Sequence, residues 1–292
     1  MSDSKVPQNG GATEEKETKK KNSFVQRVIT GLVLVTLLAL VLWAGSWCFA
    51  LVASLCIAVA IYEMHGALTA RGHHPVRWVC YAGLILSLPL MMFYSARAMI
   101  PVLVLLVFCV LVQVMRRQEP ELEDILISVM PLISIVLPAM CLVGLLDTQP
   151  RSLQLMLLIQ VFAIAVGGDT FAYFVGSAVG GPKLCPRISP NKTIAGSVGG
   201  LAGSMLMAFV VGRIFAASVP GMTVPFWGDL LVGLIGGVAG QMGDLFASMV
   251  KRHCRVKDYG TIFPGHGGMM DRLDSVFFVA IVVYCYRVIL LV

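Results

Sequence analysis

The chain has 292 residues, of which 58% are hydrophobic and 13% are charged, and its mean hydropathy is +0.85. About a quarter of the residues of a soluble domain are charged, so this composition excludes an ordinary water-soluble globular protein. The net charge of +6 is too small and too dispersed to indicate nucleic-acid binding, and the eight scattered cysteines lack the clustering of a disulfide framework or a structural zinc site.

The N-terminal residues 1–22 are polar and mixed in charge, which predicts a disordered cytoplasmic tail. The first apolar run extends from about Val25 to Ala44. It is too long for the apolar region of a signal peptide and no convincing cleavage site follows it, so we expect it to remain as a membrane helix. Residues 23–150 then form an N-terminal transmembrane region, and residues 151–292 form a catalytic transmembrane region with a polar cavity that faces the cytoplasm.

Eight further apolar runs follow the first. They cover approximately residues 47–64, 78–94, 99–115, 125–146, 153–175, 194–217, 230–250 and 275–292. Backbone polar groups cannot remain unpaired in hydrocarbon, so runs of this length must be helical. The sequence therefore predicts an all-α polytopic membrane protein with about nine transmembrane helices.

The distribution of Lys and Arg predicts the orientation of these helices. With the N-terminus on the inside, 18 of the 22 Lys and Arg residues fall in inner segments and four fall in outer segments. The outer four are Arg97, Arg151, Arg213 and Arg287. Because positive residues collect on the cytoplasmic side, we expect a cytoplasmic N-terminus, an outer C-terminus and a location in the cell (inner) membrane.

Small residues spaced four apart predict close helix packing in the second half of the chain. The pairs are Gly196/Gly200, Gly199/Gly203 and Gly236/Gly240. Such pairs allow two helix backbones to touch, so they draw together the helices that carry the polar motifs described next.

Two apolar runs contain aspartates. Asp169 lies in the sixth run, within GGDTFAYFVG, and a carboxylate inside a membrane helix costs roughly 2.5–3.5 kcal/mol on insertion scales, so it needs a partner or a function. In the eighth run, Gln241, Asp244, Ser248 and Lys251 are spaced by 3, 4 and 3 residues and share one helix face. This polar stripe should face the protein interior or a wet cavity rather than lipid.

The segment 251–275, KRHCRVKDYGTIFPGHGGMMDRLDS, mixes both charges with glycines. The glycines leave backbone N–H groups free to approach an anion, and the aspartates offer oxygen ligands of the kind that magnesium prefers. The segment therefore indicates a polyphosphate bound through a divalent cation. A second loop, GGPKLCPRISPNKT (residues 180–193), places Lys192 at a predicted helix N-terminus, where anions are also favoured.

The run from Ser248 to Asp274 resembles the signature of the phosphatidate cytidylyltransferase family. The matching positions are Ser248, Lys251-Arg252, Lys257-Asp258, Gly260, Pro264 to Gly268 and Asp271-Arg272-Leu273-Asp274. The stretches GGDTFAYFVG and ISPNKT also look like motifs of this family, so the resemblance is specific from about residue 160 to 275. The sequence departs from the family at Ala247, where Glu is common, and at Asn191, where Lys is common.

The resemblance implies an enzyme that converts CTP and phosphatidate into CDP-diacylglycerol and pyrophosphate for phospholipid biosynthesis, and it makes a homodimer plausible. The phosphatidate headgroup is already a nucleophile, so the site needs cations rather than a strong base. Predicted metal ligands for Mg²⁺, with room for a second monovalent or divalent cation, are Asp169, Asp244, Asp271 and Asp274. Predicted phosphate- and nucleotide-binding residues are Lys192, Ser248, Lys251, Arg252, Lys257, Gly267, Gly268 and Arg272, together with His266, which can instead be a turn residue.

Two other functions remain open. A CTP-dependent kinase of a membrane alcohol, such as a polyprenol or phytol, shares the membrane character and the nucleotide, but it would release CDP and would need a base. A transporter would explain the intramembrane carboxylates but not the charged, glycine-rich loop on one face. Glu63 and His65, at the end of the second run, either line the cavity or pair with headgroups at the interface, and we expect the second arrangement.

Overall fold

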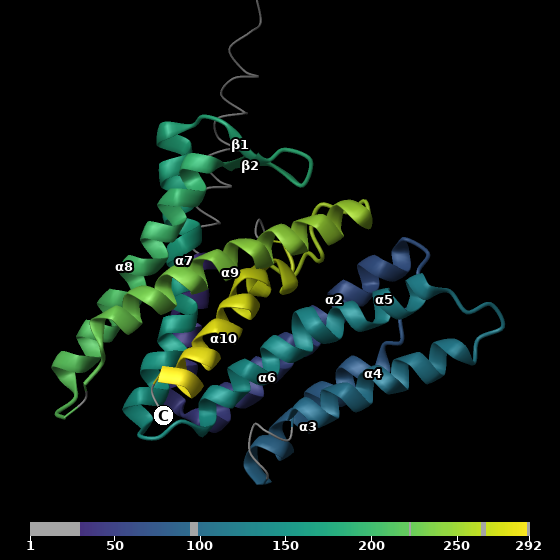
Figure 1. The fold of residues 1–292 in the computed structure, drawn as a ribbon, viewed down its shortest axis with the longest axis horizontal. Helices are drawn as coiled ribbons and strands as arrows, with labels where there is room; N and C mark the ends of the chain where they lie inside the picture. The colour runs from purple at the N-terminus through teal and green to yellow at the C-terminus, as the bar shows by residue number, and fades with distance from the viewer. Residues whose placement is uncertain (1–29, 94–98, 222, 264–266, 291–292) are drawn as a thin grey trace, which may run out of the picture.

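The computed structural model describes residues 30–93, 99–221, 223–263 and 267–290 (Figure 1). These residues form long helices and one short hairpin. In chain order the elements are the helix Thr30–Ala44, α2 Ser46–Ala70, α3 Trp78–Phe93, α4 Met99–Met115, α5 Leu122–Pro131, η2 Leu132–Val136, α6 Leu137–Gly144, η3 Leu145–Asp147, α7 Arg151–Val179, β1 Lys183–Cys185, β2 Ser189–Thr193, α8 Ile194–Ser218, α9 Phe226–His253 and α10 Met270–Leu290.

The helices coincide with the predicted apolar runs. From α5 to η3 the chain is one continuous helical stretch, Leu122–Asp147, which corresponds to the fifth run. Among the described residues, five helices are long and apolar enough to cross a membrane, and the helices that contain the first, third and fourth runs are shorter. A helical membrane protein is therefore confirmed, whereas the count of nine spans and the side of each terminus stay predictions.

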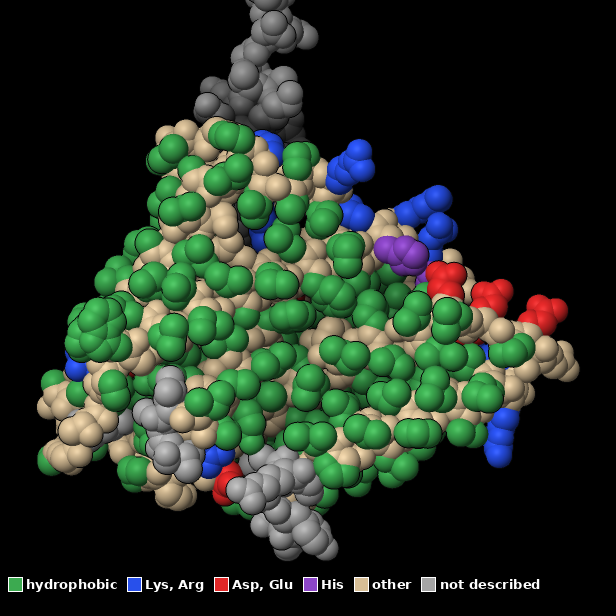
Figure 2. Space-filling model, in the orientation of Figure 1, with side chains coloured by type: hydrophobic (Ala, Val, Ile, Leu, Met, Phe, Trp, Pro, Cys, Tyr) green, Lys and Arg blue, Asp and Glu red, His purple; other side chains and the backbone are tan. Residues whose placement is uncertain are grey.

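The outer surface of the protein is apolar. Large side chains such as Trp43, Trp47 and Trp227 are exposed, and hydrophobic side chains cover most of the face in Figure 2. Charged side chains gather mainly along its upper right edge. Apolar surface of this extent is unfavourable in water and fits a hydrocarbon environment.

The loop predicted at residues 180–193 contains a two-stranded antiparallel sheet, so the fold is not strictly all-α. Gly180 and Gly181, with φ of 66° and 92°, end α7 in the left-handed region and turn the chain back. β1 and β2 pair with Lys183 opposite Thr193. The side chain of Thr193 then accepts a hydrogen bond from the backbone N–H of Gly196 at 3.0 Å, so the predicted helix start is confirmed and the strand leads directly into α8.

Two apolar cores hold the helices together. One lies among α2, α3, α4 and the α5–α6 stretch, with side chains from the ends of α9 and α10, and includes Ile61, Leu132 and Phe277. The other lies among α7, α8, α9 and α10 and includes Leu157 and Val279. Figure 1 shows α3 and α4 on the opposite side of the molecule from α7 and α8, with α9 and α10 between them.

The predicted glycine packing is confirmed, with a wider set of partners. A Cβ on Gly196 would lie 2.8 Å from the carbonyl oxygen of Ala172, so α7 and α8 touch through their backbones. Gly236 of α9 lies between α7 and α10, since a Cβ there would be 3.1 Å from Ile164 and 3.7 Å from Val279, and Gly240 faces α10, where Val279 would be 3.1 Å from a Cβ. The close packing brings α7, α8, α9 and α10 together around the polar residues.

Candidate active site

A small pocket lies among α7, α8, α9 and α10. Its lining combines glycines, which make room, with a few polar side chains. The residues are Ile164, Ala165, Gly168, Asp169, Ser204, Gly236, Gly237, Gly240, Gln241 and Ser275. Asp169 is exposed, although its position within α7 is far from both ends of the helix. Its Oδ2 lies 3.4 Å from the hydroxyl of Ser275, the donor in this contact.

The polar stripe of α9 faces the protein interior, as predicted. Gln241 donates a hydrogen bond to the carbonyl oxygen of Ser197 at 2.9 Å. One turn further, Asp244 accepts from Ser248 at 3.4 Å and forms an ion pair with Lys192, whose Nζ lies 2.5 Å from Oδ2. Lys192, near the end of β2 in the hairpin, therefore contacts the middle of the polar stripe of α9.

Asp274 completes a group of three carboxylates with Asp169 and Asp244. It is 7% exposed and lies close enough to the other two for electrostatic repulsion between them. Its Oδ1 accepts the backbone N–H of Ser275 at 2.7 Å. Among the described residues, Lys192 on Asp244 is the one Lys or Arg within 4.0 Å of these three carboxylates, so carboxylates outnumber basic side chains in the group.

Asp271 has a different environment from the other three aspartates. Its Oδ1 accepts a hydrogen bond from Nζ of Lys251 at 2.6 Å, and its Oδ2 accepts the backbone N–H groups of Tyr259 at 2.8 Å and Gly268 at 3.0 Å. Both oxygens are thus engaged in holding the loop between α9 and α10. The metal role predicted for Asp271 stays a prediction, and these contacts add a role in ordering the loop.

Tyr259 anchors the same loop beneath Lys251. Its hydroxyl donates to the carbonyl oxygen of Ala247 at 3.0 Å, and Nζ of Lys251 lies 5.5 Å from the centre of its ring, a cation–π distance. Burial, followed by the nearby Cys254 and the carboxylates of Asp271 and Asp274, raises the pKa of Tyr259. The phenol therefore stays neutral and acts as a donor.

The expectation that Glu63 and His65 pair with headgroups is wrong, because both are buried, with 5% and 1% exposed. Glu63 accepts the backbone N–H groups of Met269 at 3.0 Å and Met270 at 2.8 Å, at the start of α10. Its carboxylate also fits between two glycines, since a Cβ on Gly260 or Gly268 would lie 2.1 Å or 2.4 Å from its oxygens. The signal was present in the sequence, because a carboxylate near an apolar run predicts a specific partner.

The remaining predicted residues are at least partly exposed or lie outside the described residues. Arg252 is exposed and its Nε lies 3.4 Å from the carbonyl oxygen of Ile188 in the hairpin. Lys257 and Arg272 are exposed. Gly267 has φ of 79°, a conformation that favours glycine, whereas His266 lies outside the described residues.

The four aspartates do not converge on a single point. Among the described residues, one set of three side chains places potential metal-ligand atoms within 4.8 Å of one another, and it consists of His73, Glu123 and His253. The carboxylates of Asp169, Asp244 and Asp274 are neighbours without this convergence, and the ammonium group of Lys192 occupies one oxygen of Asp244.

Sequence comparisons identify the family of the chain. The family described as "Cytidylyltransferase family" matches residues 25–290. A phosphatidate cytidylyltransferase of Brucella abortus is 42% identical over 126 residues, which are 43% of this chain and 44% of that protein. Proteins of the same name are 49% identical over 111 residues in Bacillus subtilis (38% and 39%) and 43% identical over 131 residues in Staphylococcus saprophyticus (45% and 48%). These alignments span less than half the length of the curated relatives, but the family match covers most of the sequence, and the chain belongs to the cytidylyltransferase family.

Proposed function

We propose that the protein is a CTP:phosphatidate cytidylyltransferase that forms CDP-diacylglycerol and pyrophosphate. This proposal rests on the ion pair between Lys192 and Asp244, which lies beside Asp169 and Asp274. The loop held by the ion pair of Lys251 and Asp271 lies next to it. Cations and carboxylates are thus concentrated at one place where α7, α9 and α10 meet the hairpin. Three relatives of the chain carry the name of this enzyme.

The reaction joins two anions, and this requirement agrees with the residues. An oxygen of the phosphatidate phosphate attacks the α-phosphorus of CTP, the bond from that phosphorus to the bridging oxygen of the β-phosphate breaks, and pyrophosphate leaves with the electron pair. No proton has to be removed from the nucleophile. Lys192, Lys251 and Arg272 supply positive charge that reduces the repulsion between the phosphates.

The carboxylates of the three neighbouring aspartates are chemically suited to a magnesium ion, and their side chains would have to close on it, because they do not converge on one point in this structure. Carboxylate oxygens are ligands that Mg²⁺ prefers, and two of the three carboxylates have no Lys or Arg partner within 4.0 Å among the described residues. Asp169, Asp244 and Asp274 would hold the ion, and a bound Mg²⁺ would supply positive charge to the phosphate oxygens. Lys192 holds Asp244 in position and can exchange this carboxylate for a phosphate oxygen of CTP.

The membrane setting suits a lipid substrate. The acyl chains of phosphatidate can remain beside the apolar outer surface while the headgroup enters among α7, α9 and α10. We place the site on the cytoplasmic side of the inner membrane, because most Lys and Arg residues fall in the segments assigned to that side. A homodimer remains part of this proposal.

The test uses purified protein in detergent with radiolabelled CTP, phosphatidate and Mg²⁺. We expect label in CDP-diacylglycerol and release of pyrophosphate, and release of CDP would instead indicate a kinase. Asp244→Asn should lower the rate by at least about 10²-fold, the size of effect expected for one electrostatic contact in a reaction site. Asp147→Asn is the control, because Asp147 is an exposed carboxylate whose ion pair with Arg287 is long, at 3.8 Å. If an Asp244→Asn protein that inserts normally retains near-normal synthesis, the metal assignment is wrong.

A further inference from the structure

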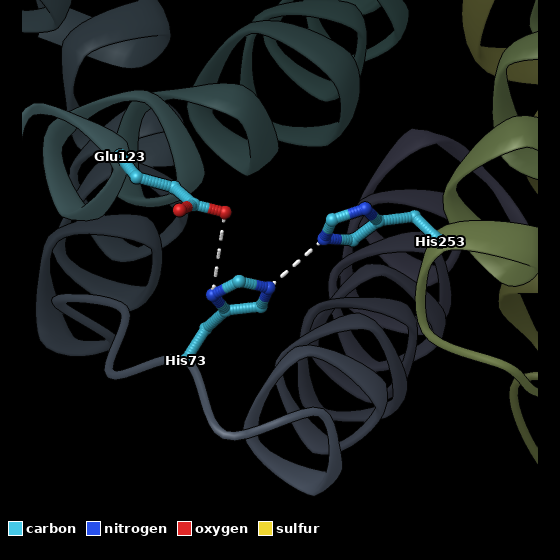
Figure 3. Close-up of side chains that lie close together, drawn as sticks. All are labelled: His73, Glu123 and His253. Carbon is cyan, nitrogen blue, oxygen red and sulfur yellow. Dashed lines mark hydrogen bonds and ion pairs between the residues drawn. The ribbon is translucent and has the colours of Figure 1, made fainter.

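Two histidines and a glutamate from three separate elements meet outside the candidate active site (Figure 3). His73 lies in the connection between α2 and α3, Glu123 lies in the first turn of α5, and His253 is the last residue of α9. The two imidazoles approach through their Nε2 atoms, which are 2.9 Å apart. Glu123 Oε1 lies 3.8 Å from Nδ1 of His73.

The short distance between the two nitrogens limits the protons that can lie between them. The ring planes differ by 13°, and Figure 3 shows the two nitrogens facing each other across the gap. At 2.9 Å only one of them can carry a hydrogen directed at the other, because two N–H groups would repel each other. At least one Nε2 therefore presents a lone pair to the gap.

Glu123 favours hydrogen on one of the two nitrogens of His73, at an ion-pair distance that is too long for a direct hydrogen bond. Its carboxylate lies on the Nδ1 side of the ring, away from His253. An N–H at Nδ1 is attracted to this carboxylate, which leaves Nε2 of His73 as the free lone pair. The same arrangement orients imidazoles in metal sites, where a carboxylate holds one ring nitrogen while the other binds the ion.

We propose that His73 and His253 bind a divalent transition-metal ion of the zinc type through their Nε2 atoms, with Glu123 orienting the ring of His73. Imidazole nitrogen suits zinc, copper and nickel, whereas magnesium prefers oxygen, so this ion differs in class from the one in the proposed active site. The ion takes the place of the hydrogen between the two rings. That hydrogen moves to Nδ1 of His253 as the ring changes tautomer, so two neutral imidazoles bind the ion without releasing a proton. Water molecules complete the coordination.

The location of the site gives the ion a structural role. The ion would link the end of α9 to the α2–α3 connection, which is remote in the sequence. His253 directly follows Lys251 and Arg252, two residues of the candidate active site. The ion would therefore fix the end of the helix that carries the polar stripe. His73 is 17% exposed and Glu123 is 56% exposed in their side chains, so an ion can reach the site from water.

The test is calorimetric titration of the purified full-length protein in detergent with Zn²⁺, in the presence of saturating Mg²⁺ to occupy oxygen-ligand sites. We expect one Zn²⁺ per chain, and stabilisation against heat that EDTA reverses. His73→Gln and His253→Gln should lose this binding, and Glu123→Gln, which keeps both imidazoles, should weaken it by about 10–100-fold.

His74→Gln is the matched control, because His74 is the exposed neighbour of His73 and is not part of the set. It should bind Zn²⁺ as the unmodified protein does. Absence of Zn²⁺ binding to the unmodified protein refutes the proposal without reference to any variant. Unchanged binding in both His73→Gln and His253→Gln, or equal loss in His74→Gln, also refutes it.

Discussion

Glu63 provides the sharpest test of how the two halves of the protein are joined. Replacement by alanine removes the carboxylate that accepts the N–H groups of Met269 and Met270. Both amides lie at the start of α10, where the first N–H groups of a helix have no partner within the helix. Glu63 itself is 5% exposed, so bulk water cannot replace it easily.

The expected loss in the free energy of unfolding follows from the two backbone amides that lose their acceptor. Leaving one buried donor unsatisfied costs about 1–3 kcal/mol, which gives a range of about 2–6 kcal/mol for two. The space vacated between Gly260 and Gly268 can admit water, which shifts the expectation toward about 3 kcal/mol. For a protein of this size that loss corresponds to a decrease in Tm on the order of 5–10 °C.

Thermal unfolding of the purified protein in detergent, followed by tryptophan fluorescence, measures this decrease. Glu121→Ala is the control, because Glu121 is an exposed glutamate at the start of α5 whose side chain makes no capping hydrogen bond. Glu63→Gln should fall between the alanine variant and the unmodified protein, since its amide keeps one acceptor oxygen. A Tm for Glu63→Ala equal to that of the unmodified protein, or an equal loss in Glu121→Ala, would show that the carboxylate does not hold α10.

Three further substitutions test other contacts by the same unfolding assay. Asp229→Ala should cost about 3 kcal/mol, because it leaves Arg213 without the buried carboxylate that it contacts at 2.9 Å, and an unchanged Tm would contradict this. Gly196→Ala should lower the free energy of unfolding by about 1–3 kcal/mol, since its Cβ would lie 2.8 Å from a backbone oxygen of α7. Its control is Gly66→Ala, which has no atom within 4 Å of the new Cβ and should be neutral or slightly stabilising. A larger loss of stability in Gly66→Ala than in Gly196→Ala would refute the packing. Tyr259→Phe should cost about 1 kcal/mol through loss of one hydrogen bond, and a gain in stability would count against that bond.

The helices could be predicted because an apolar run in a membrane must pair its own backbone N–H and C=O groups, and a helix does this within one segment. The stripe of α9 could also be predicted, since Gln241, Asp244, Ser248 and Lys251 follow helical spacing. The hairpin at residues 183–193 was missed because its strands are three and five residues long, too short for a recognisable alternation.

The contacts made by distant residues were beyond a reading of one sequence. Glu63 and Met270 are separated by 207 positions, and His73 and His253 by 180. Local spacing cannot bring such residues together, because their proximity depends on how complete helices pack. The predicted aspartates did gather in one region, although Asp271 proved to hold the loop through Lys251 and backbone amides.

The long separation between Glu63 and its partners has a consequence for biosynthesis. Ribosomes add roughly 5–20 residues per second, so the segment that begins α10 is made roughly 10–40 s after Glu63. During that interval α2 carries a carboxylate whose N–H donors, Met269 and Met270, have not yet been synthesised. The nascent N-terminal helices must therefore keep this group near water, or shield it, until the last helix arrives and completes the assembly.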